Sequence, residues 1–217
     1  MRDLLPIFVT LAGRRVLLVG GGTVAAAKLR QLQAVGADVV VVAPSVCEEI
    51  VRSGASVLRR PFEPADLEGV WFVVAAATAE ANQEVAVAAE AKHLFVNAVD
   101  DPPNASAFLS GVVRRADVTV AISTSGDAPA LTGLLREALD AVLPEDLDKW
   151  MAVAREERAK WRRDGVPMNE RRPLLLRALN RIYELAAGRT TSAEPSKEED
   201  TVSAVSASSA ASVRKDS

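Results

Sequence analysis

The stretch RVLLVGGGTVAAAK, residues 15–28, decides the fold of this chain of 217 residues. It opens with a short apolar run, Arg15–Val19, that stops at three glycines, and a helical pattern begins at Thr23. Runs that are apolar on both faces are typical of buried parallel strands. A β-branched run follows at residues 38–43. The two strands and the helix between them therefore form a βαβ unit of about 30 residues.

Within this unit, Gly20, Gly22 and Ala25 match the pattern G-x-G-x-x-G/A, directly after a strand and at the start of a helix. Gly20 permits the tight turn, Gly22 lets the backbone approach a pyrophosphate, and Ala25 permits close packing of helix on strand. The phosphates would bind to the free N–H groups and the positive dipole end of the helix. The pattern predicts a dinucleotide site in a Rossmann-like domain, with a purely structural glycine turn as the alternative.

Strands and helices continue to alternate as far as residue 105, which predicts a parallel sheet with helices on both faces. Beyond that point the pattern changes to two strands followed by three helices. We expect the strands at 107–114 and 117–123, and the helices at 129–143, 147–161 and 171–187.

The fold class predicted from this order is α/β, in several segments. A Rossmann-like parallel sheet is expected at 1–112, a small α+β segment at 113–145 and a helical segment at 146–188. Residues 189–217 contain no Leu, Ile, Phe, Tyr or Trp, so they cannot bury enough apolar area to offset the entropy of ordering. We expect them to be a disordered tail.

The composition argues against several classes of function. The net charge is −3, whereas a dedicated nucleic-acid binder is normally strongly basic. One cysteine, Cys47, and one histidine, His93, exclude an internal disulfide, a Cys/His zinc cluster and a Ser-His-Asp site with a spare histidine. Residues 1–6 lack an apolar signal core, and no apolar run approaches the roughly 20 residues that span a bilayer. We expect a soluble, cytoplasmic protein without membrane or nucleic-acid partners.

The residues that follow the second and fourth strands are candidate contacts to the cofactor. An acidic residue usually ends the second strand and holds the adenosine ribose, but this strand ends at Pro44-Ser45. Ser45 offers a hydroxyl and no charge, so charge alone does not separate NAD from NADP. After the strand at 70–76, Thr78 either contacts a nicotinamide ribose or caps the helix that follows.

Two polar segments follow later strands. The acidic loop, residues 97–101, contains Asn97, Asp100 and Asp101, and it lies on the same sheet edge as the glycine turn. A carboxylate there can accept a proton or stabilise positive charge on a substrate that loses hydride, and an Asx turn is the alternative. The serine turn, Ser123–Pro129, precedes a helix. Its hydroxyl and N–H groups would hold a carboxylate or phosphate, cap the helix, or do both.

Taken in order, these residues resemble the precorrin-2 dehydrogenase/sirohydrochlorin ferrochelatase family, the N-terminal module of siroheme synthase. The resemblance covers about residues 1–185, and the motifs recur in the family's order and spacing. The motifs are LPIF at 5–8, VLLVGGGTVAAAK at 16–28, VVAP at 41–44, AAAT at 75–78, FVNAVDD at 95–101 and AISTSGDAPAL at 121–131.

The resemblance implies that NAD⁺ oxidises precorrin-2 to sirohydrochlorin, a step that many members follow with insertion of Fe²⁺ to give siroheme. It also implies a homodimer, with residues 113–145 as the dimerisation segment. A macrocycle with its own nitrogen ligands suits a chain that lacks a His/Cys cluster. The family's NAD contacts align with Thr23, Val24, Pro44, Ser45 and Thr78, and its key aspartate aligns with Asp100. A serine of its tetrapyrrole-binding turn aligns with Thr124, and we expect Asn97, Ser123 and Thr124 to bind the substrate.

Two residues of the serine turn depart from the family pattern. Thr124 replaces a serine and keeps the hydroxyl, and Ser125 stands where glycine is usual, which crowds the turn. The many carboxylates of a tetrapyrrole substrate suit the arginines between Lys149 and Arg181, although a solvated helix face explains any one of them equally well.

Two other functions compete with this one. A nucleotide-sensing Rossmann module has no chemistry of its own, but such modules usually keep the acidic residue after the second strand. A small NAD(P)-dependent reductase of another metabolite is the second competitor.

Overall fold

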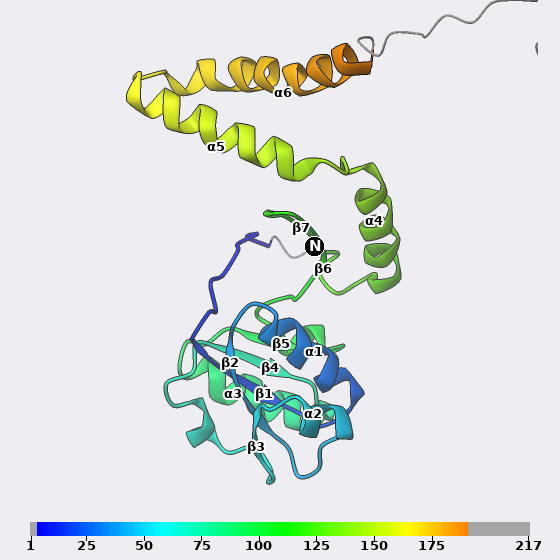
Figure 1. The fold of residues 1–217 in the computed structure, drawn as a ribbon. Coiled ribbons are helices and arrows are strands. Elements are labelled where there is room, and N and C mark those ends of the chain that lie inside the picture. Colours follow the sequence, from blue (N-terminus) through cyan, green and yellow to red (C-terminus); the bar gives the residue numbers. More distant parts are fainter. Residues whose placement is uncertain (1–3, 191–217) are drawn as a thin grey trace, which may run out of the picture. The chain divides into compact units, whose positions relative to one another are not determined.

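A computed structural model describes residues 4–190 of the chain. The chain divides into two compact units at Asp148–Lys149. The first unit contains a parallel sheet with its helices, and a β-hairpin with one further helix, while the second consists of two long helices (Figure 1). None of the helices within residues 4–190 is long and apolar enough to cross a membrane.

Five parallel strands form the sheet of the first unit, in the order β3-β2-β1-β4-β5. The central strand is β1, and its residues Val16–Val19 are all buried because helices cover both faces of the sheet. The predicted α/β, Rossmann-like fold class is thereby confirmed. The strands are β1 (Arg15–Val19), β2 (Asp38–Val42), β3 (Ser56–Leu58), β4 (Phe72–Ala75) and β5 (Val96–Ala98).

The helices of the sheet pack on opposite faces. Leu18 of β1 belongs to a core cluster with α1 (Thr23–Gln33) and α2 (Glu48–Arg52), whereas Leu17 belongs to a cluster with α3 (Ala79–Glu90). Since every strand runs in the same direction, the carboxyl ends of the strands and the N-termini of these helices meet at one edge of the sheet. Two short 3₁₀ turns, η1 (Pro64–Leu67) and η2 (Pro102–Asn104), complete the connections.

A separate antiparallel hairpin follows the sheet. It pairs β6 (Gly111–Arg115) with β7 (Val118–Ile122), and α4 (Pro129–Val142) packs on it. The expected start of the first strand at residue 107 is wrong. Residues 106–107 instead bond to β5, where the Val96 N–H donates to the Ser106 Oγ and the Ala107 N–H donates to the Val96 carbonyl, each at 2.9 Å.

The second unit is held together by contacts between its two helices, α5 (Leu147–Arg163) and α6 (Met168–Thr190). The Trp150 Nε1–H donates to the Tyr183 hydroxyl at 2.7 Å, and the two rings meet edge to face. The last helix starts at Met168, three residues before the predicted start, and Pro173 lies inside it. The tail expected to be disordered lies, from residue 191 onward, outside the described residues.

Candidate functional site

The glycine turn joins β1 to α1 and is held between two other strand ends. Gly20 has a φ of +131°, and its N–H donates to the Val42 carbonyl at the end of β2 at 3.0 Å. A Cβ on Gly20 would overlap the carbonyl oxygen of Ala76, after β4, and a Cβ on Gly21 would overlap that of Ser45, after β2. The fold itself therefore requires glycine at both positions.

Gly22 differs from its neighbours, because nothing lies within 4 Å of the position that its Cβ would take. It is the N-cap of α1, makes no side-chain capping bond, and precedes a first turn without an acidic residue. The first N–H groups of the helix, at the exposed residues Thr23 and Val24, lack intrahelical partners and carry the positive end of the dipole. This uncapped turn fits the pyrophosphate of a dinucleotide.

The loop after β2 places Pro44 and Ser45 beside the glycine turn. Both residues are exposed, and the Ser45 carbonyl lies against Gly21. The N–H of Cys47 also donates to the Gly21 carbonyl at 2.7 Å, which ties this loop to the turn. The loop thus presents an uncharged hydroxyl next to the predicted pyrophosphate site.

A cavity of about 350 Å³ opens between the strand ends. It lies where the order of the strands reverses between β1 and β4, which is the usual ligand position in an open α/β sheet. Of the predicted site residues, Val24 and Asp100 contribute to it directly. Its lining consists of Val24, Ala76, Ala77, Ala79, Asn82, Val99, Asp100 and Asp101.

Thr78 is the N-cap of α3, as one of its two predicted roles requires. Its Oγ1 accepts the N–H of Ala81 at 3.4 Å. Asn82, one turn later, is buried, and its Oδ1 accepts the N–H of Ala77 at 3.1 Å. Asn82 thereby fixes the backbone after β4. It was not among the predicted site residues, because α3 also carries Gln83 and three glutamates, so Asn82 does not stand out on this helix.

The two carboxylates of the acidic loop have different surroundings. Asp101 is half-buried, and its Oδ2 accepts the Asn104 Nδ2–H at 2.9 Å, so this side chain closes η2. Asp100 is exposed, and its carboxylate accepts no hydrogen bond from the described residues. Its φ of +55° lies in the left-handed region, which Gly, Asn and Asp tolerate best. The loop therefore presents Asp100 to the cavity with its oxygens available.

The negative charge of Asp100 acts on Lys28 of α1. Burial of the Lys28 side chain lowers the pKa of its amine below the ordinary value, and the negative charge of Asp100 offsets part of this change. Sequence reasoning did not select Lys28, because the two residues are 72 positions apart and only the sheet order brings them together.

Asn97 lies in β5 and is buried. Its Nδ2–H donates to the Ala107 carbonyl at 3.0 Å, which fastens the segment after the acidic loop to the sheet. Its Oδ1 is also buried but accepts no hydrogen bond from the described residues. A buried acceptor without a donor costs about 1–3 kcal/mol, so Asn97 is held in β5 at an energetic cost.

The serine turn caps α4 and packs against the end of the acidic loop. The Thr124 Oγ1 accepts the N–H of Ala128 at 3.2 Å and lies 3.0 Å from the Oγ1 of Thr132. A Cβ on Gly126 would lie 3.3 Å from the Cγ of Pro102, the first residue of η2. The structure therefore brings together two of the segments that the sequence selected, although the Thr124 hydroxyl is already engaged as a cap.

Ser125 has a φ of +57°, in the left-handed region where a side chain costs about 1 kcal/mol or more. We expect Ser125→Gly to raise the free energy of unfolding by about 1 kcal/mol, since the Ser123 Oγ still accepts the N–H at this position. Urea denaturation provides the measurement. The matched control, Ser56→Gly in β3, should lower stability, and a loss of stability in Ser125→Gly would contradict the strain.

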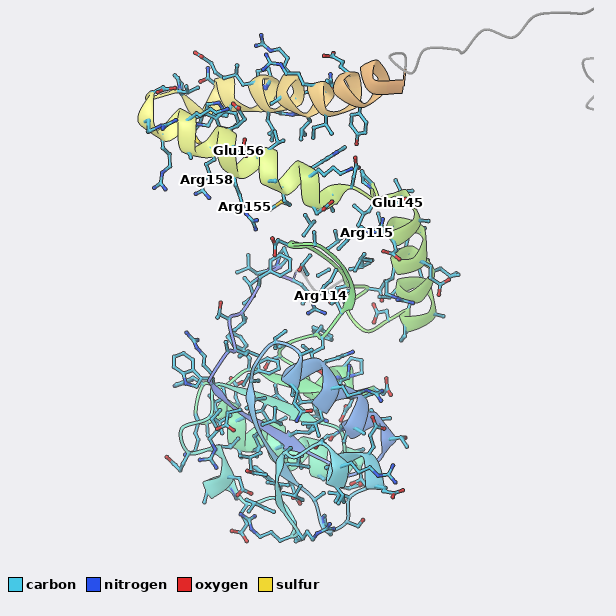
Figure 2. All side chains as sticks on the ribbon, viewed as in Figure 1. Arg114, Arg115, Glu145, Arg155, Glu156 and Arg158 are labelled. Carbon is cyan, nitrogen blue, oxygen red and sulfur yellow. The ribbon has the colours of Figure 1, made fainter. Side chains whose placement is uncertain are left out.

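Basic side chains are numerous in the second unit. Arg155 and Arg158, labelled in Figure 2, lie three residues apart on α5 and therefore share one side of the helix. Lys160 is paired with Glu157 at 2.7 Å, so part of this charge is neutralised within the helix. Within residues 4–190, no group of three His, Cys, Asp or Glu side chains is placed to hold a metal ion.

The parallel sheet, the uncapped helix N-terminus after three glycines and the cavity at the strand reversal define a Rossmann-type domain that binds a nicotinamide nucleotide. A family described as putative NAD(P)-binding matches residues 7–111. The chain is 40% identical over 204 residues to siroheme synthase of Sodalis glossinidius (strain morsitans), a match that covers 91% of this chain and 43% of that protein. It is 42% identical over 183 residues to siroheme synthase 1 of Aeromonas salmonicida (strain A449), covering 82% and 39%.

Among solved structures, the chain is similar to SirC, precorrin-2 dehydrogenase, with a TM-score of 0.59 and 26% sequence identity. That similarity covers 80% of this chain and 88% of the other. These similarities confirm the resemblance to precorrin-2 dehydrogenases and siroheme synthases that the motifs predict. It spans less than half the length of the siroheme synthases that it matches.

Proposed function

We propose that this chain oxidises precorrin-2 to sirohydrochlorin with NAD⁺. One observation carries the proposal: the N-terminal turn of α1 and the unengaged carboxylate of Asp100 border the same cavity. A domain that only senses a nucleotide has no need of a carboxylate at that place. The names of the relatives, siroheme synthase and precorrin-2 dehydrogenase, support the same substrate.

When bound, NAD⁺ would supply the acceptor for a hydride from a ring carbon of the macrocycle. Backbone N–H groups at Gly22, Thr23 and Val24 would hold its pyrophosphate. The substrate must also lose a proton, and Asp100 takes it on a carboxylate oxygen and passes it to solvent. The substrate thus loses two hydrogens, one as hydride and one as a proton. The turn at Asp100 limits where that carboxylate can lie, since few residues adopt its backbone conformation.

The remaining predicted residues have assignable roles in this proposal. Gly20 shapes the turn, Ser45 offers its hydroxyl to a ribose beside Pro44, and Thr78 orders the start of α3 at the cavity. On the substrate side, Asn97 would support the pocket from within β5, where its Nδ2–H holds the segment after the acidic loop. Ser123 and Thr124 would bind the propionate or acetate groups of the macrocycle, next to the acidic loop.

Fe²⁺ enters the proposal as a second substrate. A tetrapyrrole offers its own nitrogen ligands, so the protein need only remove the pyrrole protons that the metal displaces. Asp100 is free to collect them, because its carboxylate is not engaged in the fold.

The test is anaerobic incubation of the protein with precorrin-2 and NAD⁺, followed by absorption spectroscopy with and without Fe²⁺. We expect NADH and sirohydrochlorin in both samples and the spectrum of siroheme only with Fe²⁺. NAD⁺ binding without NADH formation would favour a nucleotide sensor. Turnover of NAD(H) with other metabolites but not with precorrin-2 would favour a different reductase.

The proposed partner is a second copy of the chain, docked through residues 113–145. A two-stranded hairpin is only marginally stable alone, and α4 is the helix that packs on β6–β7 in the part of the chain that the structure describes. The α4 helix has no buried residue, although five of its large apolar side chains follow helical spacing and are exposed. Covering such a stripe favours association. These side chains are Leu131, Leu134, Leu135, Leu139 and Val142.

Leu134→Glu should convert the homodimer into a monomer. The Leu134 side chain is 65% exposed in the single chain, so its replacement leaves the monomer's core intact but places a charge in the interface. Light scattering after size exclusion should give 23.0 kDa instead of twice that mass. Val87→Glu, at an equally exposed position on α3, is the control and should stay dimeric. A dimeric Leu134→Glu protein would remove α4 from the interface.

A further inference from the structure

Arg59 follows β3 at the carboxyl edge of the sheet, beside the loop after β2, residues 43–45. The Leu58 carbonyl accepts the N–H of Ala43 at 3.1 Å and the N–H of Arg60 at 3.0 Å. The first bond joins β3 to the loop, and the second closes a three-residue turn with Arg59 at its apex. Because neighbouring strands lie about 5 Å apart, the side chain of Arg59 is long enough to reach the end of β2.

The backbone on either side of this turn is fixed. Leu58 is paired with Val42 in the register of β3 on β2. On the other side, the Arg60 guanidinium donates to both carboxylate oxygens of Asp66, a residue that is only 6% exposed. Arg59 therefore occupies a defined place at the sheet edge, although its own side chain is exposed.

The charges around the turn leave Arg59 without a partner. Every other charged side chain between residues 43 and 66 is in an ion pair. The pairs are Glu48–Arg52, Glu49–Arg30, Glu63–Arg60 and Asp66–Arg60. Arg59 makes no hydrogen bond or ion pair with any residue in the described range 4–190. A positive charge is thus available to an anion here, and the carboxylates close to it in sequence are already bound to other cations.

The adenosine end of a dinucleotide would lie at this edge, given a pyrophosphate at the glycine turn. The Ser45 carbonyl lies against Gly21 of that turn, so the loop after β2 leads from the pyrophosphate position toward β3. In Rossmann domains an acidic residue here binds the 2′-hydroxyl of NAD⁺, whereas an arginine nearby accommodates the 2′-phosphate of NADP⁺. Residues 43–47 contain no carboxylate, and the planar guanidinium of Arg59 matches phosphate oxygens in pairs.

We propose that Arg59 binds the 2′-phosphate of NADP⁺, so that this domain takes NADP⁺ as well as NAD⁺. The inference rests on the proposed function for the position of the dinucleotide, and it adds the residue that decides how the two cofactors are told apart. The reaction itself is unchanged, because the 2′-phosphate belongs to the adenosine ribose and not to the nicotinamide end.

Calorimetric titration of the full chain with NADP⁺ and with NAD⁺ is the first test, and wild type should bind both. Arg59→Met keeps an apolar stem without the guanidinium, so NADP⁺ affinity should fall about tenfold while NAD⁺ affinity stays unchanged. Arg59→Glu places a negative charge beside the phosphate and should lower NADP⁺ affinity about a hundredfold. Arg52→Met is the matched control, because this arginine of α2 is already paired with Glu48, and it should bind both nucleotides like wild type.

The second test uses two probes without nicotinamide, adenosine 2′,5′-bisphosphate and adenosine 5′-monophosphate, which differ only in the 2′-phosphate. Wild type should prefer the bisphosphate, and Arg59→Met should lose that preference. Equal losses for both probes, or wild-type affinity for NADP⁺ in Arg59→Met, would overturn the role of Arg59. A wild type that binds NAD⁺ but excludes NADP⁺ overturns this inference and leaves the proposed function standing. Arg59-dependent binding of NADP⁺ without oxidation of precorrin-2 by either nucleotide overturns the proposed function alone.

Discussion

Replacing Asp100 with Asn will abolish the oxidation of precorrin-2 while NAD⁺ binding stays near the wild-type value. We expect kcat to fall by about a thousandfold, which is the usual contribution of a general base. Asn matches the shape of Asp and tolerates the left-handed backbone at this position, where φ is +55°. Its amide oxygen cannot take up the proton, so the fold is retained and the chemistry is lost.

Anaerobic NADH formation measures the loss, and calorimetric titration with NAD⁺ measures the retained affinity. Asp101→Asn is the matched control, because this neighbouring carboxylate is already engaged by Asn104 and an amide oxygen can accept the same hydrogen bond. The control should keep most of its activity. If Asp100→Asn turns over like wild type, the proton leaves by another group and Asp100 has no catalytic role.

The sheet and the glycine turn could be predicted because their signals are local. Val16–Val19 are apolar on both faces, and glycines follow at once, so strand, turn and helix can be read within 15 consecutive residues. The structure adds a reason that the sequence does not contain. Gly20 and Gly21 are required by the carbonyl groups of Ala76 and Ser45, whereas Gly22 is required by no contact of the fold.

The partners of the acidic loop could not be predicted, because they depend on which strands are neighbours. The charge of Asp100, after β5, acts on Lys28 of α1 because β1, β4 and β5 are successive strands of one sheet, an order that no local pattern encodes. The prediction of where β6 starts was wrong for a related reason. Residues 106–107 have a strand-like pattern, but they pair with the edge of β5 and not with the hairpin.

Gly22→Asp should raise the stability of the protein and lower its affinity for NAD⁺. The new Cβ meets open space, and the N-cap conformation, with φ −83° and ψ −173°, is extended backbone that Asp adopts readily. Its carboxylate would cap the first N–H groups of α1 and stabilise the protein by about 0.5 kcal/mol. The same carboxylate would occupy and repel the pyrophosphate position, so we expect NAD⁺ affinity to fall about a hundredfold.

Gly22→Asn isolates the charge, since Asn caps a helix as well as Asp but stays neutral. It should weaken NAD⁺ binding by only about tenfold, the part due to lost space and lost N–H donors. Gly21→Ala is the contrasting variant and should fail to fold, because its Cβ overlaps the Ser45 carbonyl. Thermal unfolding and calorimetry together give both quantities. Wild-type affinity in Gly22→Asp would mean that the phosphates bind elsewhere than at the start of α1.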